Sequence, residues 1–125
     1  MAELVRPLVV DDDALIRYAL ETLLFEEGFE VRTAQDGMEA LTLLHGWRPD
    51  VILLDLMMPQ MDGWTFRAHQ LAHPDVAKVP IVVLSGAHES KARAHELGAA
   101  AALSKPFELD DVVATVRRVI DGVRA

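Results

Sequence analysis

The sequence contains no cysteine, which excludes a disulfide framework, a thiolate metal site and a cysteine nucleophile. No apolar run approaches the ~18–20 residues that a membrane-spanning helix needs. The first ten residues, MAELVRPLVV, have too short an apolar stretch for a secretory signal, and their first charge is acidic. These absences, in a 125-residue chain that is 51% hydrophobic, predict a soluble cytoplasmic protein with a sizeable core.

Basic residues are also scarce, with 12 lysines and arginines against 20 acidic residues and a formal net charge of −8. Because nucleic-acid binding depends on neutralising phosphates with clustered positive charge, we expect no direct contact with nucleic acid. The acidity fits solubility and attraction to basic partners or cations.

Short apolar runs alternate along the chain with segments of helical periodicity. One run, Phe29–Thr33, alternates apolar and polar residues, as a half-exposed edge strand does, and the others are continuous, as in buried strands. The continuous runs are Leu8–Val10, Val51–Leu54, Ile81–Leu84 and an alanine-rich stretch that ends at Leu103. Helices are predicted where Leu15, Ile16, Ala19, Leu20, Leu23 and Leu24 share one face, at 38–44, after Asp62-Gly63, at 90–97 and from Glu108 onward.

Five strands that alternate with five helices predict an α/β fold with a doubly wound parallel sheet. The strand order 2-1-3-4-5 places the alternating strand at an edge, and right-handed crossovers place helices on both faces, as in flavodoxin-like folds. The sequence shows no internal repeat, linker or low-complexity segment. We therefore expect residues 1–125 to form a single domain.

One charged residue, Asp55, interrupts the apolar stretch VILLDLMMP at 51–59. Burial of an unpaired carboxylate is costly or raises its pKa. Other polar residues stand where the remaining buried runs end, namely Asp11 and Asp12, Ser85, and Ser104-Lys105-Pro106. Because open α/β sheets bind ligands where the carboxyl ends of their strands meet, we expect these side chains to converge.

Three neighbouring carboxylates repel one another unless a cation joins them. An all-oxygen cluster of Asp11, Asp12 and Asp55 suits Mg²⁺. Lys105 adds a second positive charge and Ser85 a hydroxyl, so that Asp55 stays ionised and can act as a nucleophile. These are the parts that phosphoryl transfer requires, and they predict an aspartyl phosphate.

Four motifs in this order and spacing resemble the response-regulator receiver domain of two-component signalling: VVDDD at 9–13, DLMMPQMDG at 55–63, LSG at 84–86 and LSKPF at 103–107. The resemblance covers essentially the whole chain. It implies that Asp55 accepts a phosphoryl group from a sensor histidine kinase or a histidine phosphotransfer protein. It also implies that Ser85 and Lys105 contact that group, and that the protein is a signalling switch rather than an enzyme.

The resemblance further implies a magnesium site formed by Asp11, Asp12, Asp55 and the backbone carbonyl of Met57. A cis peptide bond between Lys105 and Pro106 is typical of the family. The downstream protein target would bind the face made by the fourth helix, the fifth strand and the fifth helix.

The sequence departs from the family at Ala102, where a tyrosine or phenylalanine is usual. Because an alanine has no ring to reorient behind Ser85, we expect the signal to travel through backbone shifts of the loop after Ser85 and of the helix at 90–97. Met57 and Ala87, at positions that influence hydrolysis in the family, offer no group to orient water. Their identity predicts slow loss of the phosphoryl group.

Two other functions are open at this point. Asp11-Asp12-Asp13 after an apolar strand also fits the opening of haloacid-dehalogenase-type phosphatases, with Asp11 as nucleophile, although that family normally needs a longer chain. A phosphorylation-independent interaction module on the same fold is the other, and Ala102 gives it some weight. Plainer roles are expected for Asp13, as a helix N-cap, and for His69 and His73, at a solvated helix end.

Overall fold

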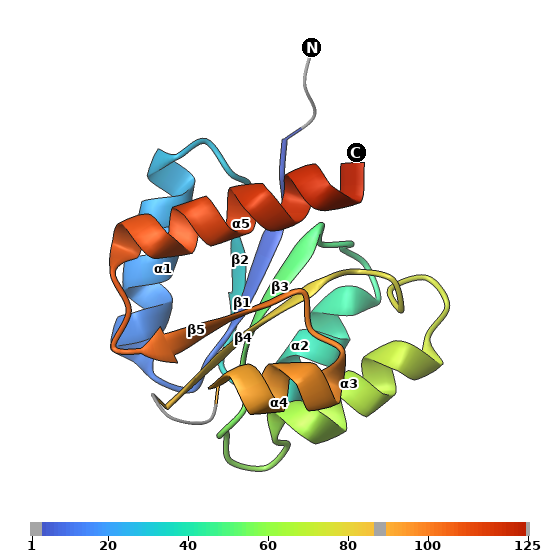
Figure 1. Ribbon diagram of the computed structural model, residues 1–125. Helices are drawn as coiled ribbons and strands as arrows, with labels where there is room; N and C mark the ends of the chain where they lie inside the picture. The colour runs from blue at the N-terminus through green and yellow to red at the C-terminus, as the bar shows by residue number, and fades with distance from the viewer. Residues whose placement is uncertain (1–3, 87–89, 125) are drawn as a thin grey trace.

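The computed structural model, which describes residues 4–86 and 90–124, is a five-stranded sheet between two layers of helices (Figure 1). The strands run parallel in the order β2-β1-β3-β4-β5, which confirms the predicted doubly wound fold. The strands are β1 (Pro7–Val10), β2 (Arg32–Ala34), β3 (Val51–Asp55), β4 (Ile81–Gly86) and β5 (Ala101–Lys105). The helices are α1 (Ala14–Glu26), α2 (Gly37–Leu44), α3 (Gly63–Ala72), α4 (Ser90–Leu97) and α5 (Leu109–Arg124).

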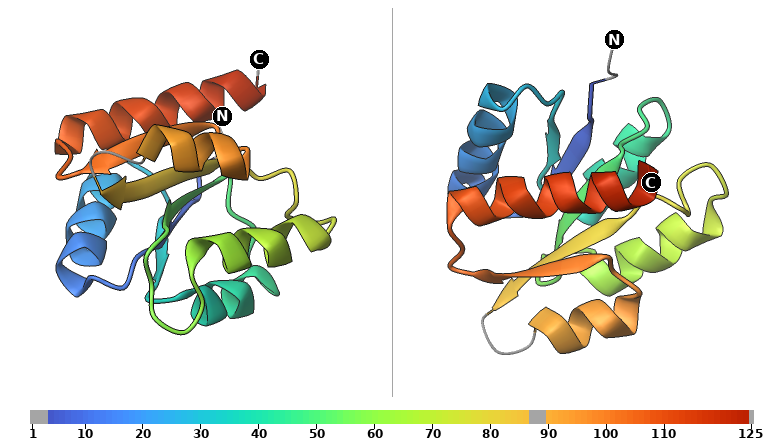
Figure 2. Two further views of the ribbon diagram at one scale, coloured as in Figure 1. Left: turned by 60° about the horizontal axis from the view of Figure 1, so that its bottom comes forward. Right: turned by 45° about the horizontal axis from the view of Figure 1, so that its top comes forward.

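The interior strands are apolar because helices cover both of their faces. α2, α3 and α4 pack on one face of the sheet, and α1 and α5 pack on the other (Figure 2). Side chains alternate along each strand, so Ile52 and Leu54 of β3 enter the first core, whereas Val51 and Leu53 enter the second. These two cores fix the register of the strands, and with it the position of the polar residues at their ends.

The second strand begins later than the sequence pattern predicts. We expected Phe29–Thr33, but β2 spans Arg32–Ala34, at the predicted edge of the sheet. Gly28 follows α1 with a positive φ of 90°, and the amide of Phe29 then donates to the carbonyl of Leu24. Phe29 is therefore buried because it packs over the end of α1, not because it belongs to a strand.

The face of α1 that meets the core is narrower than predicted. The side chains that enter the core are Ile16, Leu20, Leu23 and Leu24. Leu15 and Ala19, which we expected on the same face, are exposed. With 3.6 residues per turn, Leu15 falls on an outer stripe with Tyr18 and Phe25, and each of these three residues is at least 70% exposed.

Within the described ranges, every helix falls short of the length and apolar character that a membrane crossing would require.

Gly63 begins α3 against the end of β3. A Cβ atom at this position would lie 2.6 Å from Leu56 Cδ2 and 2.8 Å from Leu56 Cα, so the start of the helix would have to move. We expect G63A to lower the free energy of unfolding by ~2–3 kcal/mol, as over-packed positions do, in urea unfolding followed by circular dichroism. G122A in α5 is the control, because nothing lies within 4 Å of its new Cβ and alanine favours a helix. Equal stability of G63A and the wild type would contradict this close approach.

Candidate functional site

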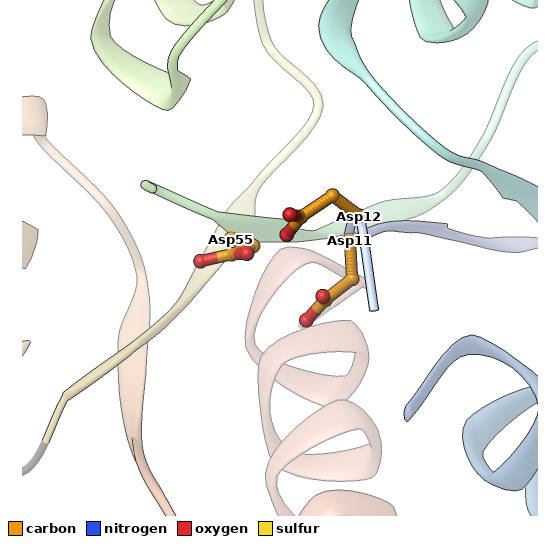
Figure 3. Close-up of side chains that lie close together, drawn as sticks. All are labelled: Asp11, Asp12 and Asp55. Atoms are coloured by element: carbon orange, nitrogen blue, oxygen red, sulfur yellow. The ribbon is translucent and has the colours of Figure 1, made fainter. Parts of the chain in front are cut away.

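Three carboxylates meet at the carboxyl edge of the sheet. Asp11 and Asp12 directly follow β1, Asp55 ends β3, and one oxygen from each lies within 4.8 Å of the others (Figure 3). They come together because β1 and β3 are neighbours, with Val10 opposite Leu54. Asp11 is fully buried and Asp55 is 3% exposed, whereas Asp12 is exposed. The predicted convergence of these three side chains is therefore observed.

Lys105 reaches this cluster from β5. Its Nζ lies 2.9 Å from Oδ2 of Asp11 and 3.5 Å from Oδ2 of Asp55. Burial lowers the pKa of Lys105, but the neighbouring Asp11 and Asp55 outweigh it and raise that pKa above its ordinary value. The ammonium group is therefore charged at neutral pH. The peptide bond between Lys105 and Pro106 is cis, as predicted.

The surroundings of Asp55 disfavour the charged form of its carboxyl group. Burial, and then the negative charge of Asp11, raise its pKa from 3.8 to about 6. The amide of Met57, which donates to Asp55 Oδ1 at 3.1 Å, and the charge of Lys105 act in the opposite direction. Asp55 is thus mainly ionised at pH 7, yet it gains more from added positive charge than an ordinary surface aspartate does.

The loop between β1 and α1 is held in place by its own side chains. Asp11 Oδ1 accepts from the amide of Asp13 at 2.9 Å, and Asp13 caps α1 as predicted, accepting from the amide of Leu15 at 2.9 Å. Arg17, which the sequence analysis did not single out, donates through Nη1 to the carbonyl of Asp11 at 2.8 Å. No side-chain spacing in the sequence signals this contact, because its acceptor is a backbone carbonyl.

Ser85 and Met57 also lie at this edge. β3 and β4 pair with Asp55 opposite Leu84, so Ser85 follows directly beyond that pair, and it is 6% exposed. Met57 contacts Asp55 through its backbone, while its side chain is turned outward and Met57 is 73% exposed. Ala87, at the position expected to affect hydrolysis, lies outside the described residues.

The residues present fit a magnesium ion. Oδ2 of Asp11 is buried and pairs with the Lys105 ammonium at 2.9 Å, so a cation is already accommodated against this cluster. All the candidate side-chain ligands are carboxylate oxygens, which Mg²⁺ prefers. Among the described residues this is the one acidic or histidine group with metal-binding spacing. His69 and His73 are exposed at the end of α3, as expected.

The profile of one protein family, the response regulator receiver domain, matches residues 8–117. The chain belongs to this family. The chain is 40% identical over 118 residues to the response regulator MprA of Mycobacterium sp. (strain KMS), which covers 93% of this chain and 50% of that protein. It therefore spans about half the length of the curated relatives that it matches first.

Solved structures of receiver domains have the same fold. The chemotaxis response regulator CheY4 of Vibrio cholerae is 34% identical to this receiver domain, with a TM-score of 0.86 over 94% of this chain and 99% of that one. The receiver domain of a histidine kinase from Syntrophus aciditrophicus is 29% identical, with a TM-score of 0.85 over 95% and 92% of the two chains.

The raised pKa of Asp55 predicts that the wild-type site destabilises the metal-free receiver domain. The folded state binds a proton at this group more tightly than the unfolded chain, so the free energy of unfolding falls as pH rises from about 4 to about 6. We expect D55N to raise the free energy of unfolding by ~1–3 kcal/mol at pH 7 without metal, and the gain to vanish near pH 4. Urea unfolding across this pH range measures it.

The control for this prediction is D75N, because the Asp75 side chain is 90% exposed. It should leave the stability and its pH dependence nearly unchanged. Added Mg²⁺ should stabilise the wild type more than D55N, because the variant has lost one candidate ligand. A D55N protein that is less stable than the wild type at pH 7 would show that the carboxylate is well compensated without metal.

Proposed function

We propose that this receiver domain accepts a phosphoryl group on Asp55 from a sensor histidine kinase or a histidine phosphotransfer protein, that it needs Mg²⁺ to do so, and that it then changes its binding to a protein partner. The observation that carries the proposal is the meeting of Asp55 with the Asp11-Asp12 pair and with Lys105 at one edge of the sheet. The fit of the chain to the receiver family supports the same function. The cytoplasmic location stays a prediction.

The chemistry follows from the charges at the site. An oxygen of the ionised Asp55 carboxylate forms the new bond to phosphorus, and the bond from phosphorus to the donor breaks, with its electron pair leaving on the donor. Lys105, 3.5 Å from Asp55, is placed to neutralise an oxygen of the incoming group. Magnesium held by Asp11, Asp12, Asp55 and the Met57 carbonyl would supply further positive charge.

Ser85 would donate a hydrogen bond to the phosphoryl group, and its position at the end of β4 links the site to the segment that leads into α4. Ala102 of β5 is half-buried and packs against the same core cluster that contains Ala94. The output face would be formed by α4, β5 and α5, and the absence of an aromatic ring at Ala102 leaves the backbone after Ser85 to carry the change.

The first test is chemical modification. Incubation with acetyl phosphate and Mg²⁺ should add one phosphoryl group to most of the wild-type protein, as seen by intact-mass spectrometry, and peptide mapping should place it on Asp55. D55N and EDTA should abolish the addition, and K105M should slow it at least ~10-fold because it removes the charge beside the acceptor. D13N is the matched control, since asparagine caps a helix as well as aspartate does.

D55N and a further variant, D11N, separate the other two functions. If the protein were a phosphatase with Asp11 as nucleophile, the wild type and D55N would hydrolyse p-nitrophenyl phosphate and D11N would not. An interaction module would leave Asp55 unmodified under all conditions. Either result would replace the proposed function.

The lifetime of the aspartyl phosphate is a second test. The Met57 side chain is a thioether that is turned outward, so it offers no amide or acid group to orient a water molecule for attack on the aspartyl phosphate. After removal of acetyl phosphate, we expect the modified protein to persist for minutes or longer at 25 °C, followed by Phos-tag electrophoresis. M57N, which adds an amide that can bind water, should shorten this time, with M38N on the exposed face of α2 as control. Loss of the wild-type phosphoryl group within seconds would contradict the expectation.

A further inference from the structure

A buried arginine joins α3 to the carboxyl end of α4. Arg67 lies on α3 and is only 9% exposed. Its Nε donates to the carbonyl of Leu97 at 3.1 Å, and its Nη2 lies 3.4 Å from the carbonyl of Gly98. Carbonyls at the end of a helix lack partners within the helix and carry the negative end of its dipole. The guanidinium matches them in both donors and charge.

Gln70 extends this contact to the chain that leads into β4. It is fully buried and accepts from Nη1 of Arg67 at 2.8 Å. Its Nε2 donates to the carbonyls of Val76 at 2.9 Å and Val79 at 3.0 Å. A single buried network therefore ties α3, the approach to β4 and the end of α4 together.

α4 makes limited apolar contact with the rest of the molecule. Of its described side chains, which run from Ala92 to Leu97, Ala94 is buried and Leu97 packs partly buried against the same core. An alanine methyl group removes little apolar surface from water, so the polar contacts of Arg67 add to the packing of Leu97 at the carboxyl end of this helix. Arg93 makes a second contact to α3, with its guanidinium 5.7 Å from the centre of the Trp64 ring. Figures 1 and 2 show α4 lying beside α3 at the β5 side of the sheet.

We propose that Arg67 clamps the carboxyl end of α4, so that α4 pivots about Leu97 and Gly98 when the receiver switches. The pivot rests on the proposed phosphorylation of Asp55, whereas the clamp exists without it. Ser85 precedes the amino end of α4 by five residues, so a movement that starts at the phosphoryl group reaches that end first. With the other end held, the helix rotates as a body instead of sliding along β5.

The test is amide hydrogen exchange of the full chain in the wild type, R67M and the surface control R118M. Methionine keeps the length and apolar stem of arginine but removes the donors and the charge. In the unmodified protein, exchange at Gly98, Ala99 and Ala100 should rise on the order of tenfold in R67M and stay unchanged in R118M. Unchanged exchange at these amides in R67M would overturn the clamp.

The pivot is tested by adding beryllofluoride with Mg²⁺ as a mimic of the phosphoryl group. In the wild type, exchange should change at 92–96 and stay constant at 98–100, and in R67M it should change across both stretches. Equal changes in both stretches of the wild type would overturn the pivot. Failure of acetyl phosphate to modify Asp55 would overturn the proposed function. The exchange measured in the unmodified protein would still test the clamp.

A measurement on the wild type covers the case in which R67M does not fold. The Nε–Hε signal of Arg67 in a ¹H–¹⁵N spectrum should be resolved from those of the exposed arginines and should exchange slowly with water, with and without beryllofluoride. R67K, which keeps the charge but loses the forked donors, should lie between the wild type and R67M. An Arg67 signal that exchanges as fast as that of Arg118 would overturn the proposal.

Discussion

The ammonium group of Lys105 offsets the electrostatic repulsion between the buried carboxylates of Asp11 and Asp55. Lys105 Nζ lies between two buried carboxylates, at 2.9 Å from Asp11 and 3.5 Å from Asp55. Repulsion between such groups is far stronger inside a protein than in water. The arrangement depends on the position of β5, because the Lys105 side chain must reach past β4 to the end of β3. Burial and the charge of Asp11 still raise the pKa of Asp55 to about 6, so the ammonium group of Lys105 offsets only part of their effect.

The reverse case is found on α3, where the positive charge of Arg67 is buried without a carboxylate among its described partners. Arg67 is compensated by helix-end carbonyls and by the Gln70 amide instead. Such a contact is directional, since each donor must meet its own oxygen. It therefore favours one orientation of α4, which the small side chains of Ala94 and Ala102 alone would specify less sharply. Leu97 of α4 and Leu103 of β5 still pack into the two cores, so the polar contact adds direction to this apolar packing.

The sequence was sufficient to predict the fold and the place of the site because both depend on pattern. Continuous apolar runs imply strands covered on both faces, and polar residues after Val10, Leu54 and Leu84 must then share an edge. The position of β2 could not be predicted in the same way. Phe29 is apolar because it packs over the end of α1, and this capping role produced the same alternation as a strand.

Side-chain networks were the other limit. On an amphipathic helix, Arg67 has the sequence signature of a solvated residue, and its burial follows from where α4 ends, which local periodicity does not encode. Arg17 is similar, since its partner is the backbone of Asp11 rather than a side chain. The prediction for Leu15 was wrong in the opposite direction, because three- and four-residue spacing placed it on the core face and the actual phase of α1 turns it outward.

The contact between Arg93 and Trp64 has a practical consequence. The chain has two tryptophans. Trp47 is buried in the core and lies under Arg32, next to the edge strand, while Trp64 lies under an arginine of α4. Indole fluorescence depends on the distance to a nearby cation. The less buried ring, Trp64, contributes the long-wavelength part of the emission spectrum. A change in that part would therefore report a movement of α4, which carries Arg93. Replacement of Trp47 by phenylalanine would leave a protein that reports on that helix without any added dye.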